Sequence, residues 1–199
     1  VTVRGPIRII PNGCDLESFK KQLVEELPEE FFTWLNHNEK VIAFCGLLDK
    51  RKGIEDLEEI CKSMLRVGIN VLIIGDFRDD KHSQSVKEIV SNYNNVYITG
   101  LTKFPLAYMQ HCEKLVFLSR AESYPRVIQE AMWLGLKVIS YDVGDVKLMV
   151  KDSDHLIAEQ GDIQSITAAL TEKYEKRITW IAVSIESVAA EYFDVISNS

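Results

Sequence analysis

At 199 residues, with 46% hydrophobic and 27% charged residues, the sequence has the size and composition of one globular domain with a well-buried core. The formal net charge of −7 excludes a general affinity for nucleic acid or for an anionic membrane surface. Any function that needs positive charge must therefore lie in a local cluster, and Lys50, Arg51 and Lys52 form the one compact basic cluster.

The four cysteines are scattered without a close pair, which indicates neither a disulfide framework nor a zinc site and favours a reducing cytoplasm. No apolar run approaches the roughly 20 residues that a membrane-spanning helix needs, and no signal peptide is visible. The chain starts with Val1 rather than Met, and a strand-like pattern begins almost at once. We therefore expect a piece of a longer protein.

Short apolar runs alternate with amphipathic stretches of helical length along the chain. The expected strands cover 7–11, 41–45, 70–74, 96–99, 115–118, 137–141 and 155–158. The expected helices cover about 54–67, 81–92, 104–111, 125–134, 163–176 and 180–197. Short, β-branched, apolar strands that alternate with helices are typical of an α/β fold with a doubly wound, Rossmann-like parallel sheet. We expect residues 1–199 to form one such domain, with its ligand at the carboxyl ends of the strands.

The basic cluster lies in a loop, residues 46–53, that follows a buried strand and opens a helix. A helix N-terminus with Lys and Arg beside it is suited to binding phosphate. Taken alone, the same residues also fit a solvated basic turn.

Two carboxylates follow the fifth expected strand. Glu122 lies in the loop before a helix and Glu130 about two turns inside it, with Pro125 expected in the first helical turn. So placed, each carboxylate can hold a pair of vicinal hydroxyls, one pair on a sugar and one on a ribose. Arg126 is unfavourable for the helix dipole at that position, which hints at an anion nearby. A surface Glu130 and an ordinary acidic residue at the helix start are the alternative interpretation.

Three further turns follow expected strands. Asn12-Gly13 follows the first strand and offers the left-handed backbone that tight turns need. Gly75-Asp76 follows the third strand, and residues 141–145 follow the sixth. Each of these turns is a weak signal by itself.

The order and spacing of these pieces are specific. In chain order they comprise Pro11-Asn12-Gly13-Cys14-Asp15, Gly46 to Gly53, Gly75-Asp76, Ser119 to Glu122, Glu130-Ala131-Met132, Gly135 to Ile139 and Asp142-Val143-Gly144. Together they resemble the C-terminal domain of family 4 glycosyltransferases, which have the GT-B fold of two facing Rossmann-like domains. The closing helix, about 180–197, resembles the family's last helix, which crosses back to the other domain.

The resemblance implies a retaining hexosyltransferase whose substrate is a nucleoside-diphosphate sugar, with no cofactor and no metal. Lys52 would contact the diphosphate, Glu122 the sugar hydroxyls and Glu130 the ribose. The implied catalytic residues are Lys52 and Glu122. The implied donor-binding residues are Gly46, Lys52, Ser123, Tyr124, Arg126 and Glu130, with Asn12, Gly13, Arg51, Asp76, Gly100 and Leu101 as further candidates near the donor.

The other half of such an enzyme, an N-terminal acceptor-binding domain, is absent from this sequence. We therefore expect the 199 residues alone to bind donor nucleotide without transferring sugar, and to expose apolar surface on the final helix. The acceptor, a glycan or a lipid-linked glycan at the inner membrane leaflet, stays open. So do the sugar and the choice between UDP and GDP.

Four residues depart from the family pattern. Leu47 replaces an Arg, Asp145 a Gly, Leu148 a Glu and Phe77 a small residue. The alternative hypothesis is therefore a non-catalytic, glycosyltransferase-like partner that stabilises an active subunit. A third interpretation, a sugar-nucleotide epimerase, needs an acid and base pair that the sequence does not offer.

Overall fold

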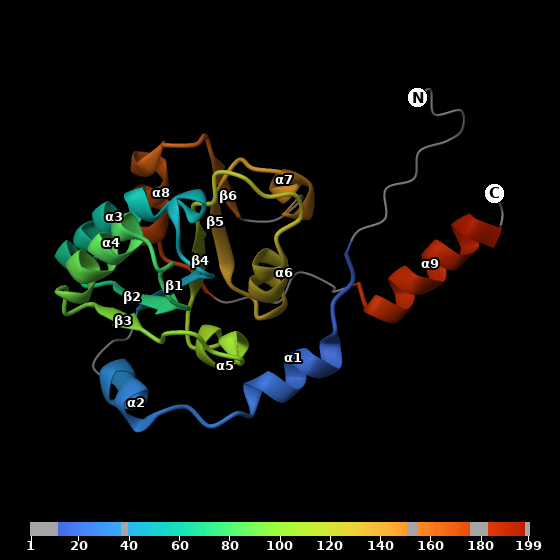
Figure 1. The fold of residues 1–199 in the computed structure, drawn as a ribbon, viewed down its shortest axis with the longest axis horizontal. Helices are drawn as coiled ribbons and strands as arrows, with labels where there is room; N and C mark the ends of the chain where they lie inside the picture. The colour runs from blue at the N-terminus through green and yellow to red at the C-terminus, as the bar shows by residue number, and fades with distance from the viewer. Residues whose placement is uncertain (1–11, 37–39, 151–154, 176–182, 198–199) are drawn as a thin grey trace.

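The computed structural model describes residues 12–36, 40–150, 155–175 and 183–197. Its centre is a six-stranded parallel sheet with the strand order β3-β2-β1-β4-β5-β6 (Figure 1). The strands are β1 (Val41–Cys45), β2 (Asn70–Ile74), β3 (Val96–Ile98), β4 (Lys114–Phe117), β5 (Lys137–Tyr141) and β6 (Leu156–Ala158). The predicted parallel, doubly wound α/β fold is therefore confirmed.

Helices cover both faces of the sheet. They are α1 (Leu16–Leu23), α2 (Glu29–Asn36), α3 (Ile54–Arg66), α4 (Lys81–Ser91), α5 (Pro105–Met109), α6 (Arg126–Trp133), α7 (Val146–Met149), α8 (Ile163–Thr171) and α9 (Ile185–Ser197), with a 3₁₀ turn, η1, at Lys50–Lys52. Buried residues of α3, α4 and α8 pack on one face, and those of α1, α2, α5, α6 and α7 on the other.

The strands are apolar on both sides because both of their faces are covered. In β1, Val41 and Ala43 join one core cluster, whereas Ile42 and Phe44 join the other. Successive side chains of a strand point to opposite faces, so a strand between two helix layers needs an unbroken apolar run rather than an alternating one. This is why the short apolar runs of the sequence located the strands.

The structure corrects some of the predicted elements. Helices α1 and α2 were not predicted, and α8 ends at Thr171 rather than near Lys176. Pro125 is the N-cap of α6 rather than a residue of its first turn. The expected strand at 7–11 lies outside the described residues, as does the start of the closing helix at Trp180.

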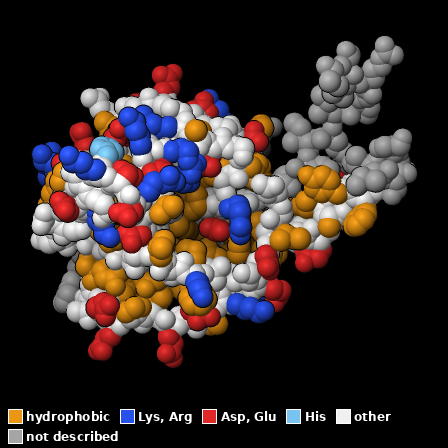
Figure 2. All heavy atoms as spheres, in the orientation of Figure 1, with side chains coloured by type: hydrophobic (Ala, Val, Ile, Leu, Met, Phe, Trp, Pro, Cys, Tyr) orange, Lys and Arg blue, Asp and Glu red, His pale blue; other side chains and the backbone are white. Residues whose placement is uncertain are grey.

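The closing helix α9 begins beside Cys14, among the first residues that the structure describes. The Cys14 amide donates to the Val183 carbonyl at 2.8 Å, and the Ile185 amide donates to the Cys14 carbonyl at 3.2 Å. Beyond this contact α9 projects from the body, and hydrophobic side chains lie along it (Figures 1 and 2). Tyr192 and Phe193 are 52% and 71% exposed, so the helix has the exposed apolar surface expected from the sequence.

Candidate functional site

The strand order reverses between β1 and β4. From β1 the chain runs outward to β2 and β3, and from β4 it runs outward to β5 and β6. The loop after β1 leads to α3 on one face, and the loop after β4 leads to α6 on the other. Loops that diverge in this way leave a crevice at the carboxyl ends of the two strands, which is where open α/β sheets bind ligands.

Lys52 reaches this crevice from η1. The Asp49 side chain caps the turn by accepting from the Lys52 amide at 3.1 Å, and Gly53 ends it with a left-handed backbone at φ 74°. A Cβ on Gly46 would lie 3.6 Å from the Lys52 Cε, so the lysine stem runs beside Gly46. The Lys52 side chain is only 17% exposed, whereas that of neighbouring Lys50 is 77% exposed. The basic loop is therefore not simply a solvated turn, although Lys and Arg side chains do gather at the surface around η1 (Figure 2).

Glu122 meets Lys52 from the other side of the crevice. Its Oε1 lies 2.6 Å from the Lys52 Nζ, 2.6 Å from the Arg51 Nη1 and 3.0 Å from the Ser119 Oγ. Burial on its own raises the pKa of Glu122, but the hydrogen bond and charge of Lys52, the hydrogen bond of Ser119 and the charge of Arg51 outweigh it. The pKa therefore lies below the ordinary 4.5. The structure thus brings together the three charged residues Arg51, Lys52 and Glu122.

Glycines let the loops around the crevice approach closely. Gly75 has φ 128°, and a Cβ there would overlap the Gly46 carbonyl oxygen. A Cβ on Gly53 would overlap the Leu118 carbonyl, and one on Gly144 the carbonyls of the Glu122 loop. These contacts hold the loop after β4 against the loops after β1 and β5, so no larger side chain fits at these positions.

Glu130 lies deeper in the site, on α6. Burial raises its pKa, and the charge of Arg126, one turn earlier and exposed at the surface, opposes that shift. Burial also raises the pKa of the Cys45 thiol to about 12, with the Glu130 charge adding to the effect and Lys52 opposing it. Cys45 ends β1, so Glu130 and Lys52 both lie near the carboxyl end of that strand.

The loop before α6 is supported by the turn after β5. The Asp145 amide donates to the Ser123 carbonyl at 2.8 Å. Ser123 is exposed and Tyr124 is half-buried, and burial together with the charges of Cys14 and Asp145 raises the pKa of Tyr124. Both residues lie at the start of α6 as predicted, between Glu122 and Glu130.

Asn12 and Gly13 lie against α6 and the start of α9. The Asn12 carbonyl accepts from the Gln129 Nε2 at 2.8 Å, which ties this turn to α6. Gly13 is not among the described glycines with a left-handed backbone, so the expectation of such a geometry is wrong for it. A Cβ on Gly13 would lie 2.7 Å from the Ile185 Cα, so glycine is needed there for the close approach of α9.

The remaining candidates lie farther along the strand edge. The Asp76 carboxylate accepts from the Lys87 Nζ of α4 at 2.7 Å, so it is engaged by a helix rather than by the Lys52–Glu122 group. The Lys87 hydrogen bond is the main reason that the pKa of Asp76 is lowered. Gly100 forms a bridge with Gly75, and Leu101 beside it is 78% exposed.

Two of the four departures from the family pattern leave apolar side chains in solvent: Leu47 is 47% exposed and Leu148 is 65% exposed. Phe77 is instead buried at 4%, where it packs with the core on the α3 side of the sheet. Asp145 stands before the first residue of α7 and binds the Ser123 carbonyl through its amide. The departures at 77 and 145 are therefore accommodated within the fold.

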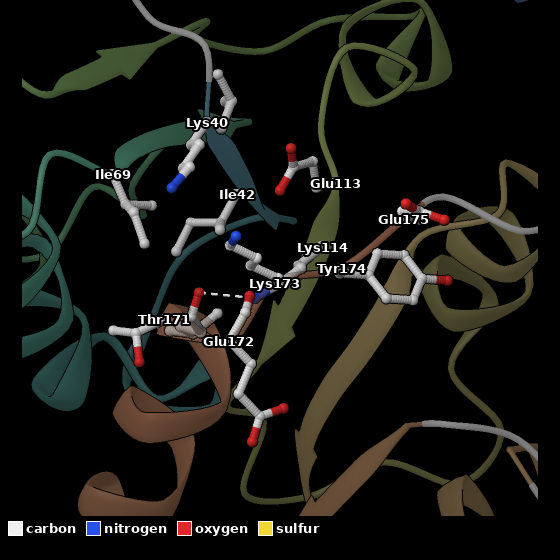
Figure 3. A pocket seen from close by; sticks show the side chains of 12 residues that line it. Lys40, Ile42, Ile69, Glu113, Lys114, Thr171, Glu172, Lys173, Tyr174 and Glu175 are labelled. Atoms are coloured by element: carbon white, nitrogen blue, oxygen red, sulfur yellow. Dashed lines mark hydrogen bonds between the residues drawn. The ribbon is translucent and has the colours of Figure 1, made fainter.

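A separate hollow of about 480 Å³ lies at the opposite, amino-terminal edge of the sheet (Figure 3). Lys114 projects there from the start of β4, and its Nζ donates to the carbonyls of Ala169, Leu170 and Glu172 at 3.0, 2.7 and 2.5 Å. Burial, more than the charge of nearby Lys137, lowers the pKa of Lys114 to about 8. This ammonium caps the end of α8, so its role here is structural.

Within the described residues, no group of three His, Cys, Asp or Glu side chains is placed to hold a metal ion. No helix in the described part of the chain is long and apolar enough to cross a membrane. All four cysteines are free thiols.

The sequence analysis missed the residues that support the site. Asp49 carried a recognisable signal, because an Asp directly before a short helical turn is a common N-cap. Ser119 was quoted only as part of a motif, and nothing in the local pattern indicates that its hydroxyl meets Glu122.

The chain matches a family model, curated relatives and solved structures. The family model described as glycosyl transferases group 1 matches residues 28–180. The chain is 29% identical over 171 residues to the capsular polysaccharide biosynthesis glycosyltransferase CapM of Staphylococcus aureus, covering 84% of this chain and 43% of CapM. It spans less than half the length of each curated relative that it matches.

Two solved structures have the same fold. The structure of HepE from Anabaena in complex with UDP-glucose superposes with a TM-score of 0.76 at 16% identity, over 96% of this chain and 57% of HepE. The lipopolysaccharide outer core galactosyltransferase WaaB gives 0.66 at 20% identity, over 81% of this chain and 50% of WaaB.

Proposed function

Because the chain belongs to the group 1 family of glycosyl transferases, we propose that it is the donor-binding domain of a retaining hexosyltransferase. Its substrate is a nucleoside-diphosphate sugar, bound in the crevice between β1 and β4. The observation that carries this proposal is the meeting of Lys52 and Glu122 at the point where the strand order reverses. A cation is suited to the diphosphate of such a donor, and a carboxylate held beside it is suited to the hydroxyls of the sugar.

The diphosphate is assigned to Lys52 and the sugar to Glu122. As the bond between sugar and diphosphate breaks, negative charge grows on the departing phosphate, and a fixed ammonium stabilises that charge. All three hydrogen bonds that the described residues make to Glu122 end on Oε1. We therefore assign the sugar hydroxyls to Oε2.

The rest of the donor extends along α6. The half-buried Glu130 lies near the end of β1, where its carboxylate is suited to accept from the two ribose hydroxyls. The exposed Arg126, together with the amides of Ser123 and Tyr124 at the start of the helix, is suited to the phosphates. Gly100 and Leu101, past β3, are assigned to the neighbourhood of the base.

The acceptor belongs to a second domain outside this chain. The curated relatives are more than twice as long as the matched region, and the exposed apolar residues of α9 offer that domain a contact surface. A cleft closed between two domains would exclude water from the reaction. The acceptor, a glycan or a lipid-linked glycan, would then be chosen by the other domain.

Leu47 and Leu148 favour a second candidate function, a glycosyltransferase-like partner that does not catalyse transfer. Exposed leucines at these positions supply no charge to a diphosphate site. Glu122→Ala in the full-length protein separates the two functions. A catalytic domain loses sugar transfer in this variant, whereas unchanged transfer by the full-length variant would eliminate the catalytic proposal.

A further inference from the structure

Three residues outside the proposed donor contacts form a hydrogen-bonded group beside the crevice. The Asp56 Oδ2 accepts from the Tyr141 hydroxyl at 2.9 Å and from the Arg120 Nη2 at 2.9 Å. Asp56 lies in the first turn of α3, Arg120 in the loop after β4, and Tyr141 at the end of β5. The group therefore joins three segments at the carboxyl edge of the sheet.

Two of the three segments lead directly to the site. Asp56 follows Lys52 by one turn, and Arg120 precedes Glu122 by two residues. The backbones are also joined, because the Arg120 amide donates to the Arg51 carbonyl at 2.8 Å. The Ser119 hydroxyl lies 3.3 Å from that carbonyl as well as 3.0 Å from Glu122. A shift of Arg120 relative to α3 would thus change the distance between the Lys52 ammonium and the Glu122 carboxylate.

The group is largely withdrawn from water. Tyr141 is fully buried, and the side chains of Asp56 and Arg120 are 20% and 32% exposed. A carboxylate that accepts from a guanidinium and a hydroxyl at such distances makes charge-assisted bonds, which are stronger than neutral ones. Asp56 also lies in the first turn of α3, where a negative charge is favourable.

We propose that Asp56, Arg120 and Tyr141 are positioning residues, a brace that sets the distance between Lys52 and Glu122 across the crevice. None of the three residues is assigned a contact with the diphosphate or with the sugar of the donor. Their effect on nucleotide affinity rests on the proposed function, whereas their effect on the Lys52–Glu122 geometry does not. The two effects are therefore measured separately.

The test uses Asp56→Asn and the milder Tyr141→Phe, which removes one hydroxyl from the brace. Tyr174→Phe is the matched control. The Tyr174 hydroxyl donates to the Gly135 carbonyl at a distance of 3.0 Å, and this hydrogen bond lies away from the crevice. In each protein the pKa of Glu122 is measured by NMR titration of its carboxyl carbon, without ligand, and binding of UDP and GDP is measured by calorimetry. Thermal unfolding shows that each variant is folded.

We expect the Glu122 pKa to rise toward its ordinary value in both brace variants, because Arg51 and Lys52 would lie farther from the carboxylate. Loss of the Asp56 charge alone would lower that pKa, so the sign identifies repositioning. Nucleotide affinity should fall about tenfold, as expected for a displaced phosphate contact. Tyr174→Phe should change neither quantity.

An unchanged Glu122 pKa in two folded brace variants would overturn the inference, whether or not nucleotide binds. If the pKa responds but the unaltered chain binds neither UDP nor GDP, the brace stands and the proposed function fails. A Glu122 pKa that moves equally in Tyr174→Phe would also contradict the inference, since any loss of a hydroxyl would then suffice.

Discussion

Lys52 and Glu122 are 70 residues apart in the sequence, yet their side chains meet at 2.6 Å between the ends of β1 and β4. Three donors converge on one carboxylate oxygen, two of them cations. The group therefore carries a net positive charge before any ligand binds. That excess is what an anionic diphosphate would neutralise.

Replacing Glu122 by Gln should separate binding of the nucleotide from transfer of the sugar. The substitution removes a negative charge that lies 2.6 Å from both Arg51 and Lys52. We expect UDP or GDP to bind this chain several-fold more tightly, because the diphosphate no longer competes with a carboxylate for the two cations. In the full-length protein, sugar transfer should fall at the same time.

Calorimetry of this chain and a transfer assay of the full-length protein measure the two effects. Glu175→Gln, an exposed change of the same charge at the opposite edge of the sheet, is the control. Weaker nucleotide binding by Glu122→Gln would contradict the assignment of the diphosphate to Lys52.

The lowered pKa of Glu122 makes a prediction about stability and pH. Because the folded-state pKa lies below the ordinary 4.5, the ionised carboxylate contributes stability above pH 4.5. That contribution is lost as the pH falls through the folded-state pKa. The unfolding midpoint of Glu122→Gln should therefore lie below that of the unaltered chain at pH 6, and the gap should narrow as the pH falls below 4.5 and close below the folded-state pKa. A gap that persists undiminished in acid would show that the ionised form is not what stabilises the fold.

Gly75 should be one of the least replaceable residues of the loops. An alanine there must adopt φ near 128° and would overlap the Gly46 carbonyl oxygen. We expect Gly75→Ala to lower the free energy of unfolding by about 3 kcal/mol. Gly68→Ala is the matched control, since Gly68 also has a positive φ but its added Cβ would meet nothing within 4 Å. That change should cost about 1 kcal/mol, and equal losses in denaturant unfolding would refute the role of the close contact.

Leu47→Arg tests whether the site lacks a cation. Leu47 is 47% exposed and directly follows Gly46, beside which the Lys52 stem lies. An added guanidinium should raise the affinity for UDP or GDP by about tenfold, because a charge-assisted bond contributes about 1.5–3 kcal/mol. Val67→Arg, at an exposed residue just after the end of α3 and away from the proposed donor contacts, controls for net charge. Equal gains from the two variants would mean that the effect is not specific to this position.

Local pattern was enough to predict most of the sheet. Strands β1, β2 and β5 were predicted to the residue, because a strand buried on both faces needs an uninterrupted apolar run between polar turns. Helix α1 was not predicted because Phe19 is its one buried residue. The preceding Asp15 did carry a signal, since it is an N-cap that accepts from the Ser18 amide. Leu16 and Leu23 of α1 are only partly buried, and the packing of this helix against α5 joins segments that are far apart in the sequence.

The site could be predicted only in part. Order and spacing placed Lys52 and Glu122 at the same edge, because both follow buried parallel strands. Their direct contact, and the support from Ser119 and Arg51, depend on two loops that are far apart in the sequence. The hydrogen bond between Asp76 and Lys87 joins residues 11 positions apart, so the Gly75-Asp76 turn alone did not indicate it.

Calorimetric titration of this chain with UDP and with GDP tests the central claim most directly, with Lys52→Ala and Lys50→Ala as variants. Lys50 lies two residues before Lys52 in the same 3₁₀ turn, is 77% exposed and lies 3.5 Å from Glu55. We predict that one nucleotide binds, that Lys52→Ala weakens it by about 10- to 100-fold, and that Lys50→Ala changes it little. Binding that survives Lys52→Ala unchanged would contradict the donor site. The absence of binding by the unaltered chain would favour the non-catalytic partner.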